Sequence, residues 1–253
     1  MAPPKILLFG DSHSYAIQRA LERREKKRQP LPLEAYRLLK MKNDIQVGDT
    51  SLERFTEIAR KLRRQDIVLS AIGGNNHAVF STIQHPVRFD FVDFTEDSET
   101  EEGTATIPYR TLEAYFAQAI HNRDGKSIEA LRKSTKARVV HMLPPPPKAD
   151  NQFIREYHES VFAKDGIISQ GVSAPRLRLR FWKLQARVLA KVCSEFGVEV
   201  MGPPQGALDP DGFLARDYYA HDATHANPDY GELVLQQVEH LYRGGEMKAA
   251  VRS

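Results

Sequence analysis

The feature that most constrains the fold is a set of short, continuously apolar segments that end in small or polar residues. Residues 5–9, 66–72 and 138–143 are the clearest, and residues 34–39 and 198–201 are weaker examples. Strands that are apolar along their whole length are typical of parallel sheets buried on both faces. The sequence therefore predicts a buried parallel sheet.

Between these strands the apolar residues recur at helical spacing. The predicted helices cover residues 14–28, 51–64, 111–123, 127–134, 176–196 and 228–242. Asp49 or Thr50 is the expected cap of the second helix. Alternating strands and helices predict an α/β fold with helices on both faces of the sheet. The length of 253 residues fits a single domain over residues 1–253.

Composition excludes several other classes of protein. The 36 basic residues nearly balance the 33 acidic ones, so no nucleic-acid partner is expected. The sequence contains no run of eighteen apolar residues, and the apolar run at residues 6–9 is too short for the core of a signal peptide. We therefore expect no membrane span and a cytoplasmic protein. Cys193 is the single cysteine, and its apolar surroundings favour a small buried hydrophobe.

One segment interrupts the pattern. The link at about residues 85–108 holds seven acidic residues between Asp90 and Glu102, mixed with phenylalanines. Long links of this kind tend to be functional or disordered. The sequence predicts an inserted flap or lid here, formed as a β-hairpin or as a mobile segment near the mouth of the site.

Polar residues that could carry chemistry follow two of the strands and recur near the C-terminus. Ser12 lies where the first strand turns into a helix, and Asn75 follows two glycines after the strand at 66–72. Ligands of open parallel sheets bind beyond the carboxyl ends of the strands. Ser12 could instead only cap its helix, and Asn75 could belong to an ordinary turn.

The third group is Asp222 with His225. A spacing of three residues lets the carboxylate reach Nδ1 of the imidazole and leaves Nε2 free to face a serine hydroxyl. A surface loop that opens the last helix at Asn227-Pro228 explains part of the same segment. Each group alone is a weak signal.

Together, the segments GDSHS, GGNN and DATH, with Gly48 between the first two, resemble the SGNH (GDSL-like) hydrolase family in chain order. The resemblance implies a flavodoxin-like three-layer α/β/α sandwich with a central five-stranded parallel sheet. Two residues depart from the family pattern. His13 replaces the usual apolar residue after the serine, and Asn76 replaces the usual aspartate after the asparagine.

The resemblance also implies roles for the site residues. Ser12 would be the nucleophile, His225 its base and Asp222 the group that orients His225. The oxyanion hole would be formed by the backbone N–H groups of Ser12 and Gly48 and by the Asn75 side chain. No metal and no cofactor is implied. Residues expected to contact the substrate are His13, Asn76, His77 and Tyr218.

The resulting hypothesis is a serine esterase that cleaves O-acyl esters of a small molecule or a carbohydrate, with O-acetyl sugars as one class. An acyltransferase with the same triad is a second hypothesis, and a non-catalytic flavodoxin-like module that binds a phosphate at residues 10–14 is a third. The nine histidines show no metal-ligand spacing. Arg176, Arg178 and Arg180 are expected to form a solvated helix start, with a site for an anionic substrate group as the alternative.

Overall fold

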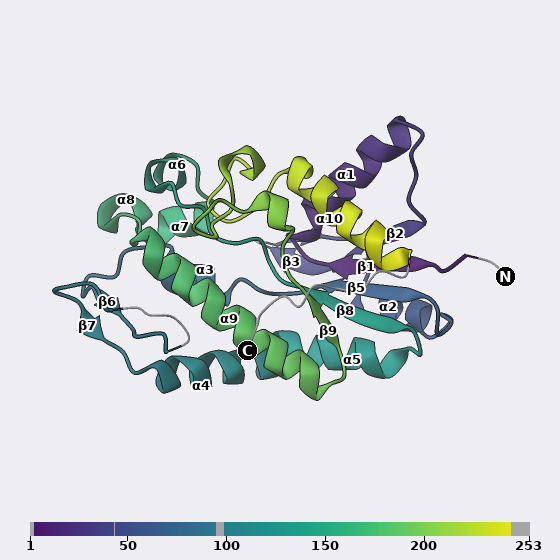
Figure 1. Cartoon of the computed structure of the whole chain (residues 1–253), viewed down its shortest axis with the longest axis horizontal. Helices are drawn as coiled ribbons and strands as arrows, with labels where there is room; N and C mark the ends of the chain where they lie inside the picture. The colour runs from purple at the N-terminus through teal and green to yellow at the C-terminus, as the bar shows by residue number, and fades with distance from the viewer. Residues whose placement is uncertain (1–2, 43, 95–98, 244–253) are drawn as a thin grey trace.

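A five-stranded parallel sheet forms the centre of the computed structural model, which describes residues 3–42, 44–94 and 99–243 (Figure 1). The strand order is β2-β1-β5-β8-β9. These strands are β1 (Ile6–Gly10), β2 (Leu33–Arg37), β5 (Ile67–Ala71), β8 (Arg138–Met142) and β9 (Glu199–Met201). The predicted five-stranded parallel sheet is confirmed, and its order is the flavodoxin-like one.

Alternate side chains of each strand enter two separate cores. Ile6 and Leu8 of β1 pack under one helical layer, and Leu7 and Phe9 pack under the other. Figure 1 shows α1 and α10 together on one side of the sheet, with α4, α5 and α9 on the other. The fold is therefore the predicted three-layer α/β/α sandwich.

Most of the long helices agree closely with the sequence pattern, but the helix expected over residues 51–64 already ends at Ala59. They are α1 (Ser14–Lys26), α2 (Leu52–Ala59), α4 (Tyr109–Ile120), α5 (Lys126–Ser134), α9 (Pro175–Glu195) and α10 (Pro228–Tyr242). The Asn227 side chain caps α10 by accepting from the backbone N–H groups of residues 229 and 230. The expected cap of α2 was wrong by one or two residues, because Ser51 accepts from the backbone of Arg54.

Short elements fill the connections and were not predicted. They are the hairpin β3 (Lys40–Lys42) and β4 (Ile45–Val47), and the helices α3 (Asn76–Ser81), α6 (Asn151–Glu156), α7 (Ser160–Lys164) and α8 (Ile167–Gln170). Each is too short to show helical or alternating periodicity in the sequence. None of the helices in the described residues has the length and apolar character needed to cross a bilayer.

The acidic link at residues 85–108 is anchored where the structure describes it. Residues 95–98 lie outside the described part. Strands β6 (Phe89–Asp90) and β7 (Ala105–Thr106) pair in parallel, so the expected hairpin is not formed between them. Phe91 is fully buried in the core. The Asp90 carboxylate accepts from Arg180 at 2.7 Å, so the link is fixed to α9.

The arginines at the start of α9 are not all solvated, contrary to expectation. Arg178 and Arg180 are both 2% exposed. Arg178 donates to the backbone carbonyls of Ser173 and Lys148, and Arg180 pairs with Asp90. Their burial depends on partners from other segments, the Lys148 carbonyl and the Asp90 carboxylate, which the local charge pattern does not show. Cys193 is buried in the core as expected.

Candidate active site

The turn after β1 carries two serines, Ser12 and Ser14, and only the hydroxyl of Ser14 is hydrogen-bonded within the turn. The Ser14 hydroxyl donates to the Asp11 carbonyl at 2.7 Å and is buried, so it stabilises the turn. Ser12 is half-buried, and its hydroxyl makes no hydrogen bond to any residue that the structure describes. The alternative in which Ser12 caps α1 is therefore not the arrangement seen.

The turns after β1 and β5 are tied to each other. The sheet register pairs Gly10 with Ala71, so both turns leave the same edge of the sheet. The Asp11 carboxylate accepts from the backbone N–H of Gly73 at 2.9 Å and from Lys40 at 2.9 Å. Gly73 has a φ of +72°, and a Cβ there would lie 2.0 Å from the carboxyl carbon of Asp124. Ser12 and Asn75 thus lie just after the two strands that flank the point where the strand order reverses, which is where such sheets bind ligands.

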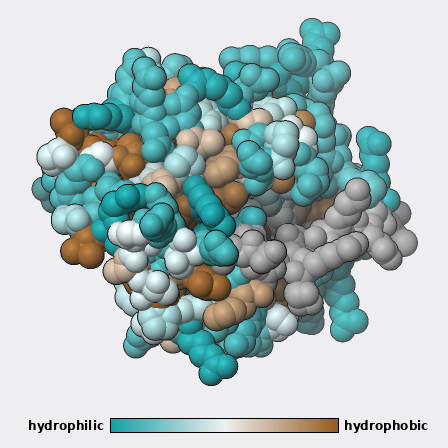
Figure 2. Space-filling view, turned by 60° about the vertical axis from the view of Figure 1, so that its left-hand side comes forward, coloured by the Kyte–Doolittle hydropathy of each residue, from teal (hydrophilic) through white to brown (hydrophobic). Residues whose placement is uncertain are grey.

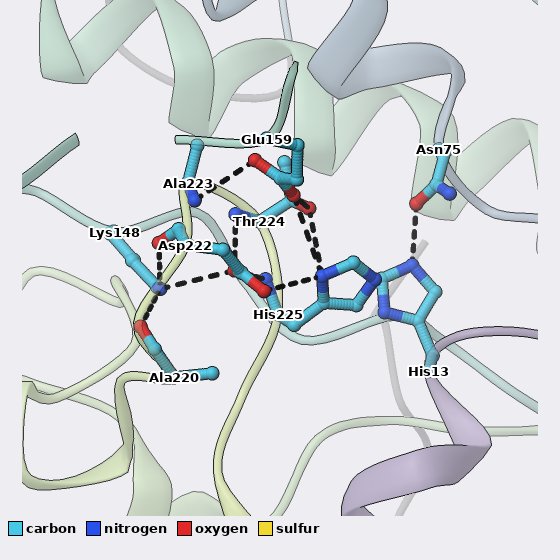
Figure 3. A network of polar contacts seen from close by, with 9 residues as sticks. All are labelled: His13, Asn75, Lys148, Glu159, Ala220, Asp222, Ala223, Thr224 and His225. Carbon is cyan, nitrogen blue, oxygen red and sulfur yellow. Dashed lines mark hydrogen bonds and ion pairs between the residues drawn. The ribbon is translucent and has the colours of Figure 1, made fainter. Parts of the chain in front are cut away.

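Asn75 has a defined orientation because His13 contacts it. Nε2 of His13 lies 2.5 Å from Oδ1 of Asn75 (Figure 3). Burial lowers the pKa of His13, and the nearby His225 lowers it further, so the ring is neutral near pH 7. A neutral ring that donates from Nε2 accounts for this contact and turns the Asn75 NH₂ group away from His13.

His225 and Asp222 form the hydrogen bond that their spacing predicts. Nδ1 of His225 lies 2.8 Å from Oδ2 of Asp222, and the backbone N–H of His225 donates to Oδ1 at 2.7 Å. Nε2 of His225 is buried, without a hydrogen-bond partner among the described residues, and Figure 3 shows it directed toward the His13 ring. The ring centroids of His13 and His225 are 5.1 Å apart. The two histidines therefore line one site, and the Ser12–His225 hydrogen bond is not made.

Two residues that the sequence analysis missed complete the surroundings of His225. Glu159 lies 3.4 Å from Nδ1 of His225, and its carboxylate accepts from the backbone N–H of Ala223 and from the hydroxyl of Thr224. The Lys148 ammonium donates to the carbonyls of Ala220 and Asp222 (Figure 3). Its side chain is 1% exposed. Neither residue belongs to a motif or a periodic pattern, so the sequence carried no signal for them.

The carboxylates of Asp222 and Glu159 raise the pKa of His225. Burial alone would lower that pKa, but the hydrogen bonds and charges of Asp222 and Glu159 raise it to about 9. Burial opposes ionisation of Asp222, yet its bonds to His225 hold the pKa of this carboxyl well below its usual range. Burial lowers the pKa of Lys148 to about 8 against the attraction of Asp222. The surroundings therefore favour the protonated imidazole.

The three expected oxyanion donors are not used by the fold. The backbone N–H groups of Ser12 and Gly48 and the amide nitrogen of Asn75 donate to no acceptor in the described residues. Gly48 has a φ of +89°, and a Cβ there would lie 2.3 Å from the Leu38 carbonyl oxygen, so only glycine fits. Free N–H donors are what an oxyanion hole requires.

A pocket opens beside His13 at the carboxyl ends of β5, β8 and β9. It encloses about 400 Å³, including the part open to solvent, and lies under α1 and α10. Apolar side chains dominate its lining, Ile17, Met142, Met201 and Val234 among them, and His13 and Gln237 add polar groups. Figure 2 shows brown apolar side chains among the teal polar ones on one face of the molecule.

The other residues expected to bind substrate have mixed positions. Asn76 is the half-buried first residue of α3. His77 is buried, and its Nδ1 lies 3.0 Å from the Gly74 carbonyl; burial lowers its pKa to about 4. Tyr218 packs against the core under α1 and α10. A contact of these residues with substrate stays a prediction.

Glu159, Asp222 and His225 also have the composition of a small metal site, because one ligand atom of each lies within 4.8 Å of the others. Their oxygen atoms are already engaged by backbone N–H groups and by the Thr224 hydroxyl. The Lys148 ammonium lies 3.6 Å from Oδ1 of Asp222. A cation beside these atoms would have to displace these donors, so we interpret the cluster as an internal network around the imidazole.

The chain is similar in structure to GDSL-like lipases and related lipases. Solved structures in this group include an extracellular lipase of Streptomyces rimosus (TM-score 0.49, 12% identity, covering 93% of this chain and 99% of that one). A phospholipase A1 of Streptomyces albidoflavus NA297 has a TM-score of 0.48 and 13% identity, covering 94% and 99%. A GDSL-like lipase of Bacteroides thetaiotaomicron has a TM-score of 0.46 and 12% identity, covering 96% and 92%.

No family model and no curated protein matches the chain. These similarities have TM-scores below 0.5, so they carry no argument about the function of this chain.

Proposed function

We propose that this protein is a serine esterase that cleaves O-acyl esters through an acyl-enzyme intermediate on Ser12. The observation that carries the proposal is the hydrogen-bonded Asp222–His225 pair, whose free Nε2 lies buried at the edge of the sheet that also carries Ser12 and Asn75. A phosphate-binding module has no need of an oriented imidazole with a raised proton affinity, so that alternative leaves the pair unexplained.

In the proposed first step, the Ser12 oxygen attacks the acyl carbon while Nε2 of His225 takes the hydroxyl proton. Asp222 holds the imidazole in the tautomer with Nδ1–H, which leaves the Nε2 lone pair available. The structure does not show the Ser12–His225 bond, and such bonds often form only when substrate is bound. His225 then gives the proton to the leaving alcohol.

The negative charge that develops on the acyl oxygen would be bound by the N–H groups of Ser12 and Gly48 and by the Asn75 amide. His13 is neutral, so it adds no charge to the site. Its hydrogen bond to Oδ1 of Asn75 fixes the amide and leaves the Asn75 NH₂ group free for the oxyanion. A preorganised donor of this kind is worth far more in the transition state than in the ground state.

In the second step, water attacks the acyl-enzyme with His225 again acting as the base, which releases the acid and restores Ser12. An acceptor alcohol in place of water would make the protein an acyltransferase. For the acyl group we propose the pocket beside His13, whose walls include Ile17, Met142 and Val234. Short acyl chains, acetyl among them, suit this pocket, and the polar residues around it suit a sugar or another polar alcohol.

The test is a fluorophosphonate probe combined with p-nitrophenyl esters of increasing chain length and an acetylated sugar. The wild-type protein should be labelled on Ser12, and Ser12→Ala should lose label and roughly 10³-fold or more of its turnover. Ser14→Ala is the matched control, because it removes a neighbouring hydroxyl that bonds only to the Asp11 carbonyl. That variant should keep its label and lose about 1 kcal/mol of stability.

Full turnover by Ser12→Ala on an ester that the wild type cleaves would refute the nucleophile. Product analysis with an added sugar acceptor separates hydrolysis from transfer. If neither ester cleavage nor labelling occurs in the folded wild-type protein, the esterase proposal is wrong.

A further inference from the structure

Glu159 and Asp222 both contact His225, but they come from different parts of the chain. Glu159 directly precedes α7, whereas Asp222 and His225 share the loop before α10. Oε1 of Glu159 lies 3.4 Å from Nδ1 of His225, and Oε2 accepts from the backbone N–H of Ala223 at 3.0 Å. One side chain therefore contacts both the imidazole and the backbone that carries it.

We propose that Glu159 is a positioning residue of the active site: a second carboxylate that, with Asp222, holds His225 by Nδ1 and stabilises the imidazole in the state that has accepted the serine proton. This inference rests on the proposed function, because it assigns Glu159 to the base of that reaction. Glu159 does not touch the reacting atoms and acts through His225.

The balance of charge around the imidazole supports this role. The groups that face it are the carboxylates of Asp222 and Glu159, the Lys148 ammonium behind Asp222 and the neutral ring of His13. With neutral His225 the two carboxylates exceed the single ammonium by one negative charge. Protonation of His225 removes that excess, and because the ring is partly buried, water screens this compensation less than it would at the surface.

Lys148 explains why two carboxylates can lie so close to one histidine. Its ammonium is buried between the Ala220 and Asp222 carbonyls and 3.6 Å from Oδ1 of Asp222. Arg178 of α9 donates to the Lys148 carbonyl at 2.9 Å and so fixes the backbone of the lysine. The repulsion between Asp222 and Glu159 is thereby offset on the side away from His225.

The experiment compares wild-type protein with Glu159→Gln, which keeps the size of the side chain and removes its charge. The imidazole resonances of His225 are titrated by NMR and assigned by their loss in His225→Gln. The pH profile of kcat/KM is measured on p-nitrophenyl acetate. In Glu159→Gln the NMR pKa of His225 and the acid limb of the profile should both move to lower pH by about one unit, a tenfold change in proton affinity. The plateau of kcat/KM should fall.

Two further variants separate this role from a structural one. Glu159→Asp keeps the charge but withdraws it by one methylene, so it should shift both quantities in the same direction by less, and it serves where Glu159→Gln does not fold. Glu232→Gln is the matched control, because it removes a carboxylate that bonds Arg24 between α1 and α10. It should lower stability and leave the pH profile and the His225 titration unchanged.

The outcomes distinguish the two proposals. An unchanged NMR pKa of His225 in Glu159→Gln overturns the role of Glu159, whether or not esters are cleaved. A uniform loss of activity at every pH with no shift of the acid limb also overturns it, since that marks a purely structural residue. If wild-type protein cleaves no ester while the NMR pKa still shifts, the esterase proposal is refuted, and the positioning role falls with it.

Discussion

The buried ion pair between Asp90 and Arg180 indicates that the acidic link at residues 85–108 is a structural segment and not a lid, and this can be tested by substitution. Both side chains are almost fully buried, and Nη1 of Arg180 lies 2.7 Å from each carboxylate oxygen of Asp90. Asp90 also accepts from the backbone of Phe91 and Glu101, and Arg180 donates to the Glu99 carbonyl. Asp90→Asn keeps the shape of the side chain and leaves the buried guanidinium without its counter-charge.

Removing one partner of a buried pair costs about 3–5 kcal/mol, because the remaining charge is not solvated. For a chain of this length each kcal/mol lowers the Tm by roughly 2–4 °C, so the Tm should fall by about 6–20 °C. Glu22→Gln breaks the exposed pair with Arg19 and should cost less than about 1 kcal/mol. The same chemical change therefore has different costs at the two sites.

Urea denaturation of the wild type, Asp90→Asn, Arg180→Met and the double variant gives the coupling free energy of the pair. The double variant should recover part of the loss, since no unpaired charge remains. Ester selectivity should change little in the folded variants. A loss below about 1 kcal/mol in Asp90→Asn, or a large change of acyl preference at unchanged stability, would refute this reasoning and restore the lid.

Three further predictions concern the proposed active site and the core. Asn75→Ala should lower kcat by roughly 10²–10³-fold with little effect on KM, as measured by steady-state kinetics, because its amide acts on developing charge. The folded pKa of His225 is about 9, above its usual 6.5, so its stabilisation is complete below about pH 6.5 and lost as the pH rises through 9. The difference in unfolding free energy between wild type and His225→Gln should therefore shrink by up to ~3 kcal/mol from pH 6 to pH 10; a constant difference would contradict it. Cys193→Ser places a hydroxyl in the core and should cost about 1–3 kcal/mol while turnover is unchanged, which the same assays check.

The sheet could be predicted from the sequence because its central strands β1 and β5 are almost entirely apolar. Burial on both faces imposes that composition on residues 67–71 of β5, all of which are buried. Residues 76–81 and 151–170 fold into short helices whose apolar residues do not repeat often enough to show a period. The burial of Arg178 and Arg180 could not be predicted, because it depends on the Lys148 carbonyl and the Asp90 carboxylate, which lie 30 and 90 positions away in the sequence.

The hydrogen bond of Asp222 to His225 could be predicted because both residues lie in one short loop. Glu159 and Lys148 could not, since they lie 64 positions or more in the sequence from the loop residues that they contact. The contact of His13 with Asn75 joins residues 62 positions apart. His13 stood out only as a departure from a pattern, and its partner follows from the pairing of β1 with β5.

The carboxylate of Asp11, which bonds both Gly73 and Lys40, has a consequence for how this site could be altered by protein engineering. Ser12 and Asn75 follow neighbouring strands of one sheet. The hydrogen bonds of Asp11 fix the distance between the two turns just beyond the ends of these strands. His225 instead arrives on a loop that Lys148 and Glu159 fasten from outside the sheet. Insertions or exchanges among residues 149–173 would therefore change the position of the His225 loop. The distance between Ser12 and Asn75, which the sheet determines, would stay the same. Directed evolution of substrate range has room in that segment, whereas the two turns that follow β1 and β5 tolerate little change.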